Sequence, residues 1–358
     1  MAITGNKGEW SEIYTLFRLL GEGKVHAGDA NLNKLKLFYP IIDIIREESK
    51  RYDYKPDQKR HIVIINEEGK EYIKIPMSQF MTESKALLDA ISKGGNRAFA
   101  VPCAERFMKN IGCTKLKAPS KNKADIQIVI HDLRTNTTPL LGFSIKSQLG
   151  SPSTLLNPGK TTNITYCVNE EISDTDISAI NSIDSHISRM KTLQRYHITL
   201  SSIENDTFNN NLLFLDAYMP HFISDCLLKY NLSGHSVLPV KDVVSSIANA
   251  NPFGFRGKNV NTFYEHKMKV LLIAAALGMT PAKEWTGRYD ANGGYLVVKT
   301  DGEIVCYHFY NINDVEDYLY NNTRFECASR GRYDFGNLYR GNDGKVYIKL
   351  NLQIRFSK

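Results

Sequence analysis

Two stretches of sequence decide the fold: Asp125-Ile126-Gln127-Ile128-Val129-Ile130 and Leu140-Leu141-Gly142-Phe143-Ser144-Ile145-Lys146-Ser147. Both are short and apolar in alternate positions, and the first is rich in β-branched residues. In both, polar side chains alternate with apolar ones, which predicts strands with one buried face. Turn-forming residues fill the connecting segment 132–139. We therefore expect the two strands to form an antiparallel hairpin.

The pairing of this hairpin determines which side chains lie together. A turn centred on the middle of segment 132–139 would place Asp125 opposite Lys146 and Gln127 opposite Ser144. Directly opposed residues project from the same face of an antiparallel pair. One face would therefore be polar, and the other would carry the apolar residues Ile126, Ile128, Ile130, Phe143 and Ile145. A carboxylate and an ammonium group are expected side by side at the open end.

A carboxylate beside a lysine suits the hydrolysis of a phosphodiester. That reaction needs a divalent cation to activate water and to neutralise charge, and carboxylate oxygens suit Mg²⁺. A nearby lysine can position or deprotonate the water and stabilise the developing charge. The alternative interpretation is a solvated strand face with a cross-strand ion pair that contributes well under about 1 kcal/mol.

Secondary structure around the hairpin follows from hydrophobic periodicity and turn residues. Helices are predicted at residues 10–20, 40–49, 78–92, 102–110 and 261–277. A second β-hairpin is predicted from 61–65 and 71–75, and short strands at 295–299, 304–309 and 346–350. Segment 201–236 should mix helix and loop, with a break at Asn209–Asn211, and a domain boundary is expected near residues 251–257.

Composition places the chain among ordinary globular proteins. Of 358 residues, 42% are hydrophobic and 23% are charged, which excludes long disorder. A net charge of +7 permits a nucleic-acid partner without requiring one. We expect no signal peptide, and the longest apolar run, 270–277, is too short for a membrane span. Six scattered cysteines without a C-x-x-C pair indicate reduced thiols, no structural zinc site and a cytoplasmic protein.

Longer blocks of sequence carry a family resemblance. The chain resembles HpaII-type type II restriction endonucleases of the PD-(D/E)xK nuclease superfamily over nearly its whole length. The blocks are Gly8-Glu9-Trp10-Ser11-Glu12, Lys123-Ala124-Asp125-Ile126, Gly142-Phe143-Ser144-Ile145-Lys146-Ser147 with Gly150, Ser153-Thr154-Leu155-Leu156-Asn157, Glu265-His266-Lys267-Met268-Lys269, Ala276-Leu277-Gly278-Met279 and Lys349-Leu350-Asn351-Leu352-Gln353-Ile354-Arg355-Phe356.

The resemblance implies an α/β (α+β) fold in which a mixed β-sheet core is flanked by helices, with an additional C-terminal α+β region. We expect three consecutive parts. Residues 1–95 would form a helical region with a β-hairpin and contribute a helix to the nuclease core. Residues 96–250 would form the catalytic core, and residues 251–358 the region for DNA recognition.

The catalytic pattern departs from the superfamily at two positions. Ala124 stands where the pattern has proline, and Ser144 replaces the acid of (D/E)xK. With Asp125 and Lys146 as the matching catalytic residues, a second carboxylate must come from elsewhere. Lys7-Gly8-x-x-x-Glu12 resembles the first-helix K-G-x-x-x-E of other superfamily members, so Glu12 is the first candidate metal ligand beside Asp125. Glu105 is the second candidate, and Glu170 and Glu171 are the third.

Candidate DNA contacts come from basic and polar residues near these positions. Residues 106–123 hold six basic side chains and no acid, including Lys117, Lys121 and Lys123, which is consistent with phosphate contacts; a solvated basic face is the alternative. Arg330 and Arg332 are candidates for base readout, because arginine reads guanine in the major groove. The remaining candidates lie just beyond the catalytic strand and are Gln148, Ser151, Thr154 and Asn157.

The resemblance further implies an activity. It implies a bacterial Mg²⁺-dependent endonuclease that cuts double-stranded DNA at the palindrome CCGG after the first C, leaves 5′-phosphates and is blocked by CpG methylation. A homodimer on DNA and a cognate DNA methyltransferase in the same system are also expected. Two alternatives stay open: a DNA-binding protein without catalysis, and a repair or junction nuclease of the same superfamily.

Overall fold

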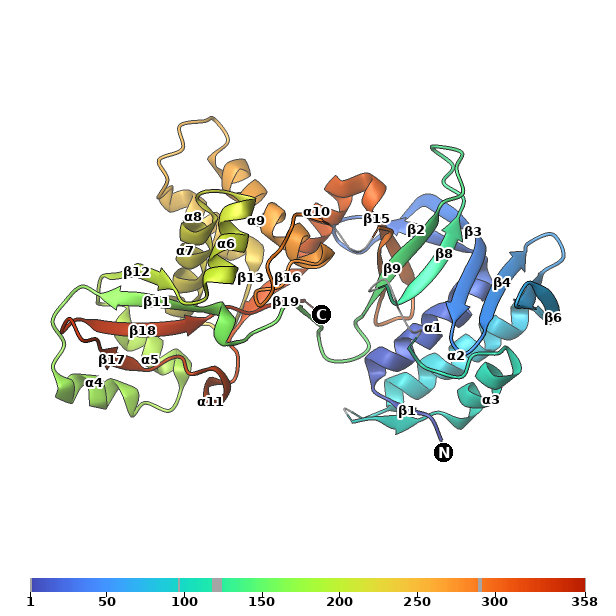
Figure 1. The fold of residues 1–358 in the computed structure, drawn as a ribbon, viewed down its shortest axis with the longest axis horizontal. Helices are drawn as coiled ribbons and strands as arrows, with labels where there is room; N and C mark the ends of the chain where they lie inside the picture. The colour runs from blue at the N-terminus through green and yellow to red at the C-terminus, as the bar shows by residue number, and fades with distance from the viewer. Residues whose placement is uncertain (1, 96, 118–123, 289–291, 358) are drawn as a thin grey trace. The chain divides into compact units, whose positions relative to one another are not determined.

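A computed structural model gives the fold and describes residues 2–95, 97–117, 124–288 and 292–357 (Figure 1). The chain divides into two compact units. The first contains Met1–Ser153 and Asp290–Tyr318, and the second contains Thr154–Tyr289 and Leu319–Lys358. This division differs from the three consecutive parts expected from the sequence, because each unit is assembled from two separate segments of the chain.

Within the described residues, the first unit is built on a nine-stranded mixed sheet of order β2-β15-β14-β9-β8-β3-β4-β5-β6. The pairs β9–β14 and β2–β15 are parallel, and the other pairs are antiparallel. The strands are β2 (Lys24–Gly28), β3 (Lys34–Glu47), β4 (Arg51–Asp57), β5 (Ile62–Glu67), β6 (Lys70–Pro76), β8 (Ile126–Ile130), β9 (Leu140–Ser147), β14 (Gly294–Val298) and β15 (Ile304–His308). The small pair β1 (Thr4–Gly5) and β7 (Phe99–Ala100) lies outside this sheet.

The predicted central hairpin is present as β8 and β9, but its register differs by two residues. Ile126 pairs with Phe143 and Ile128 with Leu141, so the same register places Asp125 opposite Ser144 rather than Lys146. The cause is the turn, which is closed by a bridge between Asp132 and Thr137 and is therefore centred one residue earlier than expected. A shift of two residues keeps every side chain on its predicted face.

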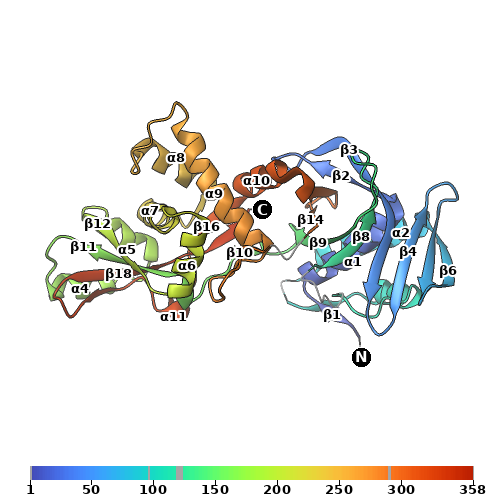
Figure 2. The ribbon, with the colours of Figure 1, turned by 45° about the horizontal axis from the view of Figure 1, so that its top comes forward.

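Helices α1 (Lys7–Glu22) and α2 (Met77–Lys93) lie side by side against the apolar face of the sheet (Figures 1 and 2). Their side chains bury the predicted strand face in one core that includes Trp10, Phe17, Phe80, Ile128 and Phe143. An Asn6–Glu9 capping box begins α1, and Gly23 ends it with a φ of +65°, a conformation that favours glycine. The third helix is α3 (Pro102–Asn110), as predicted.

The predicted helix at 40–49 is wrong, because residues 40–47 belong to the long strand β3. Four isoleucines in this segment are β-branched and favour a strand over a helix. Pro40 stands opposite Lys24 of β2, and the strand then pairs with β8 from Ile41 onward. Tertiary pairing on both sides thus overrides the helix-starting preference of the proline.

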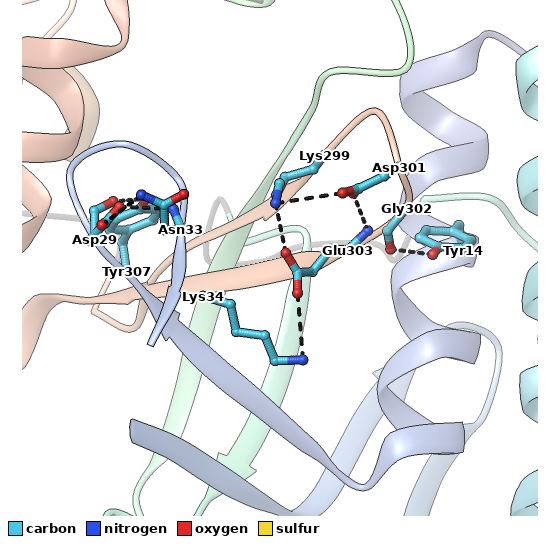
Figure 3. Close-up of polar contacts among 9 residues, drawn as sticks. All are labelled: Tyr14, Asp29, Asn33, Lys34, Lys299, Asp301, Gly302, Glu303 and Tyr307. Atoms are coloured by element: carbon cyan, nitrogen blue, oxygen red, sulfur yellow. Dashed lines mark hydrogen bonds and ion pairs between the residues drawn. The ribbon is translucent and has the colours of Figure 1, made fainter. Parts of the chain in front are cut away.

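The β14–β15 hairpin returns to the first unit late in the sequence and is held there by polar contacts (Figure 3). In its turn, Lys299 binds Glu303 at 2.7 Å, and Glu303 also pairs with Lys34 of β3 at 3.6 Å. Tyr14 of α1 donates to the carbonyl oxygen of Gly302 in the same turn. Together with the parallel pairing of β14 with β9 and of β15 with β2, these contacts hold the hairpin in the first unit. Helix α10 (Ile312–Asn321) follows the hairpin.

The second unit contains two four-stranded antiparallel sheets, of order β12-β11-β18-β17 and β10-β19-β16-β13 among the described residues. Its strands are β10 (Thr154–Leu156), β11 (Asn163–Val168), β12 (Ile198–Ile203), β13 (Val237–Pro239), β16 (Thr323–Glu326), β17 (Leu338–Arg340), β18 (Val346–Asn351) and β19 (Ile354–Phe356). Its helices are α4 (Asp174–Asn181), α5 (His186–Leu193), α6 (Asp206–Leu215), α7 (Met219–Leu232), α8 (Val240–Ala250), α9 (Val260–Leu277) and α11 (Arg330–Tyr333).

Two predictions for the second unit have different outcomes. The helix expected at 261–277 is confirmed as α9. The break expected at Asn209–Asn211 is wrong, because α6 runs through these residues. Asn211 is buried, and its amide donates to the carbonyl oxygens of Thr280 and Lys283, so tertiary hydrogen bonds satisfy a residue that otherwise favours turns.

The structure confirms the predicted fold class, since helices cover a mixed sheet in one unit and an α+β arrangement forms the other. The segment 251–257, expected to be a domain boundary, lies inside the second unit between α8 and α9. In the part of the chain that the structure describes, no helix is both long enough and apolar enough to span a membrane.

Candidate active site

A cavity of about 490 Å³ in the first unit brings predicted catalytic residues together. The N-terminal half of α1, the start of β8, and the end of β9 with its following loop form its walls. The lining residues are Asn6, Lys7, Gly8, Glu9, Glu12, Lys117, Asp125, Ile145, Lys146, Ser147, Gly150, Ser151 and Ser153. Glu12, Asp125 and Lys146 are therefore neighbours in one concave site.

Asp125 immediately precedes β8, and its carboxylate is fixed by the neighbouring strand. Its Oδ2 atom accepts hydrogen bonds from the Ser144 hydroxyl at 3.0 Å and from the Ile145 N–H at 2.7 Å. Ser144, the residue in place of the expected acid, thus acts as a donor to Asp125. Among the described residues, no hydrogen bond is formed by Oδ1, which leaves that oxygen available to a ligand in the cavity.

Glu12 reaches the cavity from α1. Burial and the negative charge of Asp125 together raise the pKa of Glu12 to about 8. The positive charges of Lys117 and Arg46 oppose this shift. In the described part of the chain, its carboxylate has no hydrogen-bond or ion-pair partner. Two carboxylates that repel each other in a partly buried site are the arrangement that a bound cation would stabilise.

Lys146, near the end of β9, is the third member of the group. Its Nζ atom lies 5.3 Å from the centre of the Tyr295 ring on β14, the next strand of the sheet. Burial lowers the pKa of Lys146, and the nearby charges of Asp125 and Glu12 act in the opposite direction. Burial and the charge of Asp125 also raise the pKa of Tyr295.

The contact between α1 and β9 was not predicted, although it sets the position of Glu12. The hydroxyls of Ser11 and Ser147 lie 2.7 Å apart across this contact. The loop after β9 also comes close, because a Cβ atom at Gly150 would lie 3.2 Å from the Cβ atom of Lys7. The signal in the sequence was the small side chains at these positions, which allow a close approach.

The other candidate acids lie elsewhere. Glu105 on α3 does not line the cavity, and its carboxylate accepts the Ile3 N–H at 3.1 Å and pairs with Lys109 at 3.0 Å. Glu170 belongs to the second unit, where it accepts the His197 N–H at 2.9 Å. Glu171 is exposed in the same unit.

The predicted DNA contacts are divided between the two units. Lys117 and Ser151 line the cavity, and Gln148 lies in the loop after β9, where its main-chain N–H donates to Val298. Lys121 and Lys123 lie outside the described residues. In the second unit, Thr154 is in β10, Asn157 follows it and is exposed, and α11 contains Arg330 and the exposed Arg332.

Several other basic residues of the C-terminal segment form ion pairs within the second unit. Arg340 binds Asp174 at 2.7 Å, Lys349 binds Glu204 at 2.8 Å, and Arg355 binds Glu326 at 2.8 Å. Part of the positive charge in this segment is therefore balanced by acids from distant positions of the chain.

The chemistry of the donor set fits Mg²⁺. In the described part of the chain, no group of three or more His, Cys, Asp or Glu side chains is arranged to hold a metal ion. Mg²⁺ is commonly held by one or two carboxylates and completes its coordination with water and substrate phosphates. Asp125 and Glu12 supply two carboxylates to the cavity, so these residues meet that requirement.

Comparisons with known proteins give the family of the chain. The family model described as HpaII restriction endonuclease matches residues 6–356. The type II restriction enzyme HpaII of Haemophilus parainfluenzae is 43% identical over 358 residues, which cover 99% of this chain and 98% of that enzyme. No solved structure gives a significant match. The chain belongs to the HpaII restriction endonuclease family.

Proposed function

We propose that this restriction endonuclease hydrolyses double-stranded DNA in a Mg²⁺-dependent reaction that leaves 5′-phosphate ends. One observation carries the proposal: Glu12, Asp125 and Lys146 come from separate parts of the sequence and line one cavity. A cluster of two carboxylates and one lysine supplies the groups that phosphodiester hydrolysis requires.

Asp125 and Glu12 would hold the cation. When bound there, Mg²⁺ would supply water activation and neutralisation of the charge that develops on the phosphate. The two hydrogen bonds to Oδ2 of Asp125 hold its carboxylate in place, and Oδ1 would bind the cation. Ser144 therefore has a positioning role in the proposed reaction.

Lys146 would act on the attacking water. Because burial lowers its pKa, the ammonium group gives up its proton more readily than an exposed lysine does. A lysine in this state can accept a proton from water, and it can also stabilise negative charge when it is protonated. Attack in line with the leaving 3′ oxygen then leaves the phosphate on the 5′ end.

The specificity that we propose is the palindrome CCGG, cut after the first C and blocked by CpG methylation. The support is resemblance to the HpaII family along almost the whole chain, since 43% identity extends over 99% of it. A palindromic target favours a homodimer on DNA, because the two-fold axis of the protein then matches that of the site. A DNA methyltransferase of the same system would protect the host.

Digestion of plasmid DNA tests this function directly. The protein is incubated with plasmid DNA and Mg²⁺, with EDTA as the control, and the fragment ends are sequenced. We expect discrete fragments whose ends all read C/CGG, and no cutting of CpG-methylated plasmid. Smearing, or ends without a common sequence, would contradict a restriction activity, and another common sequence would refute CCGG alone.

A DNA-binding protein without catalysis is the second candidate, and Ser144 favours it because the strand lacks the expected acid. Asp125→Ala and Lys146→Ala separate the two functions. For an endonuclease, both variants should retain binding to target DNA and lose Mg²⁺-dependent cutting. If both variants cut at the wild-type rate, the proposed site is wrong.

A further inference from the structure

A buried ion pair does not line the cavity, although the positive charge of its arginine acts on the pKa of Glu12. Arg46 is in β3 and Glu48 directly follows that strand, and their side chains are 3% and 2% exposed. Nη2 of Arg46 lies 3.1 Å from Oε1 of Glu48. A buried ion pair contributes little net stability, because the loss of hydration offsets the attraction between the charges. Its other contacts therefore indicate what it does.

These contacts all go to one segment, the residues that follow α3. Nη2 of Arg46 donates to the carbonyl oxygen of Lys115 at 2.8 Å. Oε2 of Glu48 accepts the Thr114 N–H at 3.0 Å and also the Thr114 hydroxyl. Because the pair binds the main chain on both sides of residue 114, it fixes the path of the backbone there. We call Arg46, Glu48 and Thr114 the clamp.

The fixed segment leads within two residues to Lys117, which lines the cavity. The ammonium group of Lys117 lies 3.3 Å from Oε1 of Glu9, and the lysine side chain is 63% exposed. Oε2 of Glu9 meanwhile accepts the Asn6 N–H in the capping box of α1. An ion pair this exposed is weak, so a DNA phosphate can replace Glu9 as the partner of Lys117.

We propose that the clamp is a positioning device that holds Lys117 at the mouth of the active site, where it binds a phosphate of the DNA backbone in exchange for Glu9. The proposal rests on the proposed function, because it assumes that DNA enters this cavity. Lys117 then contributes to the affinity for DNA, and the clamp contributes through Lys117. Glu9 competes with DNA for the same ammonium group.

Four variants separate these roles. Lys117→Ala removes the phosphate contact, and Glu9→Gln removes the competing charge but leaves a residue that still forms a capping box. Glu48→Gln weakens the clamp, because either orientation of the amide places an NH₂ group against a donor of Arg46 or Thr114. Thr114→Val is a milder change that removes only the hydroxyl donor.

The matched control is Glu303→Gln. It breaks two ion pairs of the same sheet, those of Glu303 with Lys299 and Lys34, and Glu303 does not line the cavity (Figure 3). Each variant is compared with wild type in single-turnover cleavage of plasmid DNA with enzyme in excess. The half-saturating enzyme concentration and the plateau rate are measured at several salt concentrations, and thermal unfolding checks that each variant folds.

We expect Lys117→Ala to raise the half-saturating enzyme concentration about tenfold and to change the plateau rate less than about threefold. The slope of the logarithm of this concentration against the logarithm of the salt concentration should fall by about one. Glu9→Gln should lower the half-saturating concentration several-fold. Glu48→Gln, and Thr114→Val more weakly, should act in the same direction as Lys117→Ala. A double variant of Lys117 and Glu48 should be no worse than Lys117→Ala alone, because the clamp acts through Lys117.

Other outcomes overturn the proposal. If the effects of Lys117→Ala and Glu48→Gln multiply, the clamp does not act through Lys117. If Lys117→Ala leaves the half-saturating concentration unchanged, or Glu9→Gln raises it, Lys117 does not bind phosphate. If Glu48→Gln does not fold, Thr114→Val with and without Lys117→Ala decides the same question. Failure of the proposed function is recognised separately, because Asp125→Ala would then cut DNA normally.

Discussion

The acidity of Glu12 gives a sharp prediction for the dependence of Mg²⁺ binding on pH. The pKa of Glu12 is raised from 4.5 to about 8, so the metal-free protein holds the proton on this carboxyl at neutral pH. Mg²⁺ requires the carboxylate, and its binding must therefore displace the proton. The affinity for Mg²⁺ should increase as pH rises and should level off above pH 8.

The size of the effect follows from the same pKa. One pH unit below a pKa, about a tenth of a carboxyl group is ionised, and two units below it about a hundredth. The half-saturating Mg²⁺ concentration should therefore rise about tenfold for each unit by which pH falls below 8. The raised pKa also means that the metal-free fold loses stability as pH rises from about 4.5 to 8, and that Mg²⁺ restores it.

The assay is a Mg²⁺ titration of DNA cleavage between pH 6.5 and 8.5. The half-saturating concentration, rather than the plateau rate, isolates Glu12 from the titration of Lys146. Glu12→Gln should bind Mg²⁺ more weakly and lose the pH dependence of binding, because an amide does not titrate in this range. Glu105→Gln, which alters a carboxylate outside the cavity, should keep the wild-type dependence. A flat Mg²⁺ affinity in the wild type, or a Glu12→Gln variant with the wild-type slope, refutes the reasoning.

Three further predictions concern other parts of the chain. Burial raises the pKa of Asp43 to about 7, and among the described residues its Oδ1 atom has no hydrogen-bond partner. As pH rises from 5 to 8, the unfolding free energy of Asp43→Asn should therefore gain about 3 kcal/mol relative to that of wild type. Urea denaturation of both proteins at both pH values measures this difference. Ser144→Ala removes one of two hydrogen bonds to Asp125 and should slow cleavage less than about tenfold, whereas a loss like that of Asp125→Ala would show that Ser144 acts directly. Asn211→Ala leaves the 280–285 loop without its amide contacts and should destabilise the second unit by ~1–3 kcal/mol. Urea denaturation measures this loss, and an unchanged urea midpoint of unfolding would contradict the role of Asn211.

The local pattern predicted elements better than it predicted their pairing. Strand β9, helix α3 and the extent of α9 follow from periodicity and from glycine or proline at their ends. The two-residue error in the β8–β9 register arose because the sequence of the turn does not fix where it closes. The long strand β3 was mistaken for a helix at 40–49, since β8, which pairs with it from Ile41 onward, comes from a distant segment of the sequence.

For the candidate site, the residues that the sequence could identify are those in recognisable motifs. Asp125 and Lys146 belong to a strand pattern, and Glu12 was ranked first through the motif around Lys7 and Gly8. All three line the cavity, whereas Glu105, which has no such motif around it, does not. The Arg46–Glu48 pair has no sequence signal, because its contacts join β3 to a loop that follows α3, far along the chain.

The serine at position 144 changes how the site must be assembled. With an acid at 144, a strand hairpin alone would supply two carboxylates, and the metal site would be local to β8 and β9. Here Ser144 donates to Asp125, and the second carboxylate comes from α1. The two oxygen donors then meet only when α1 is docked on β9 through Ser11 and Ser147. A cation bound by both elements would stabilise the docked state over any state in which they separate, so the proposed metal site would link metal binding to the packing of α1.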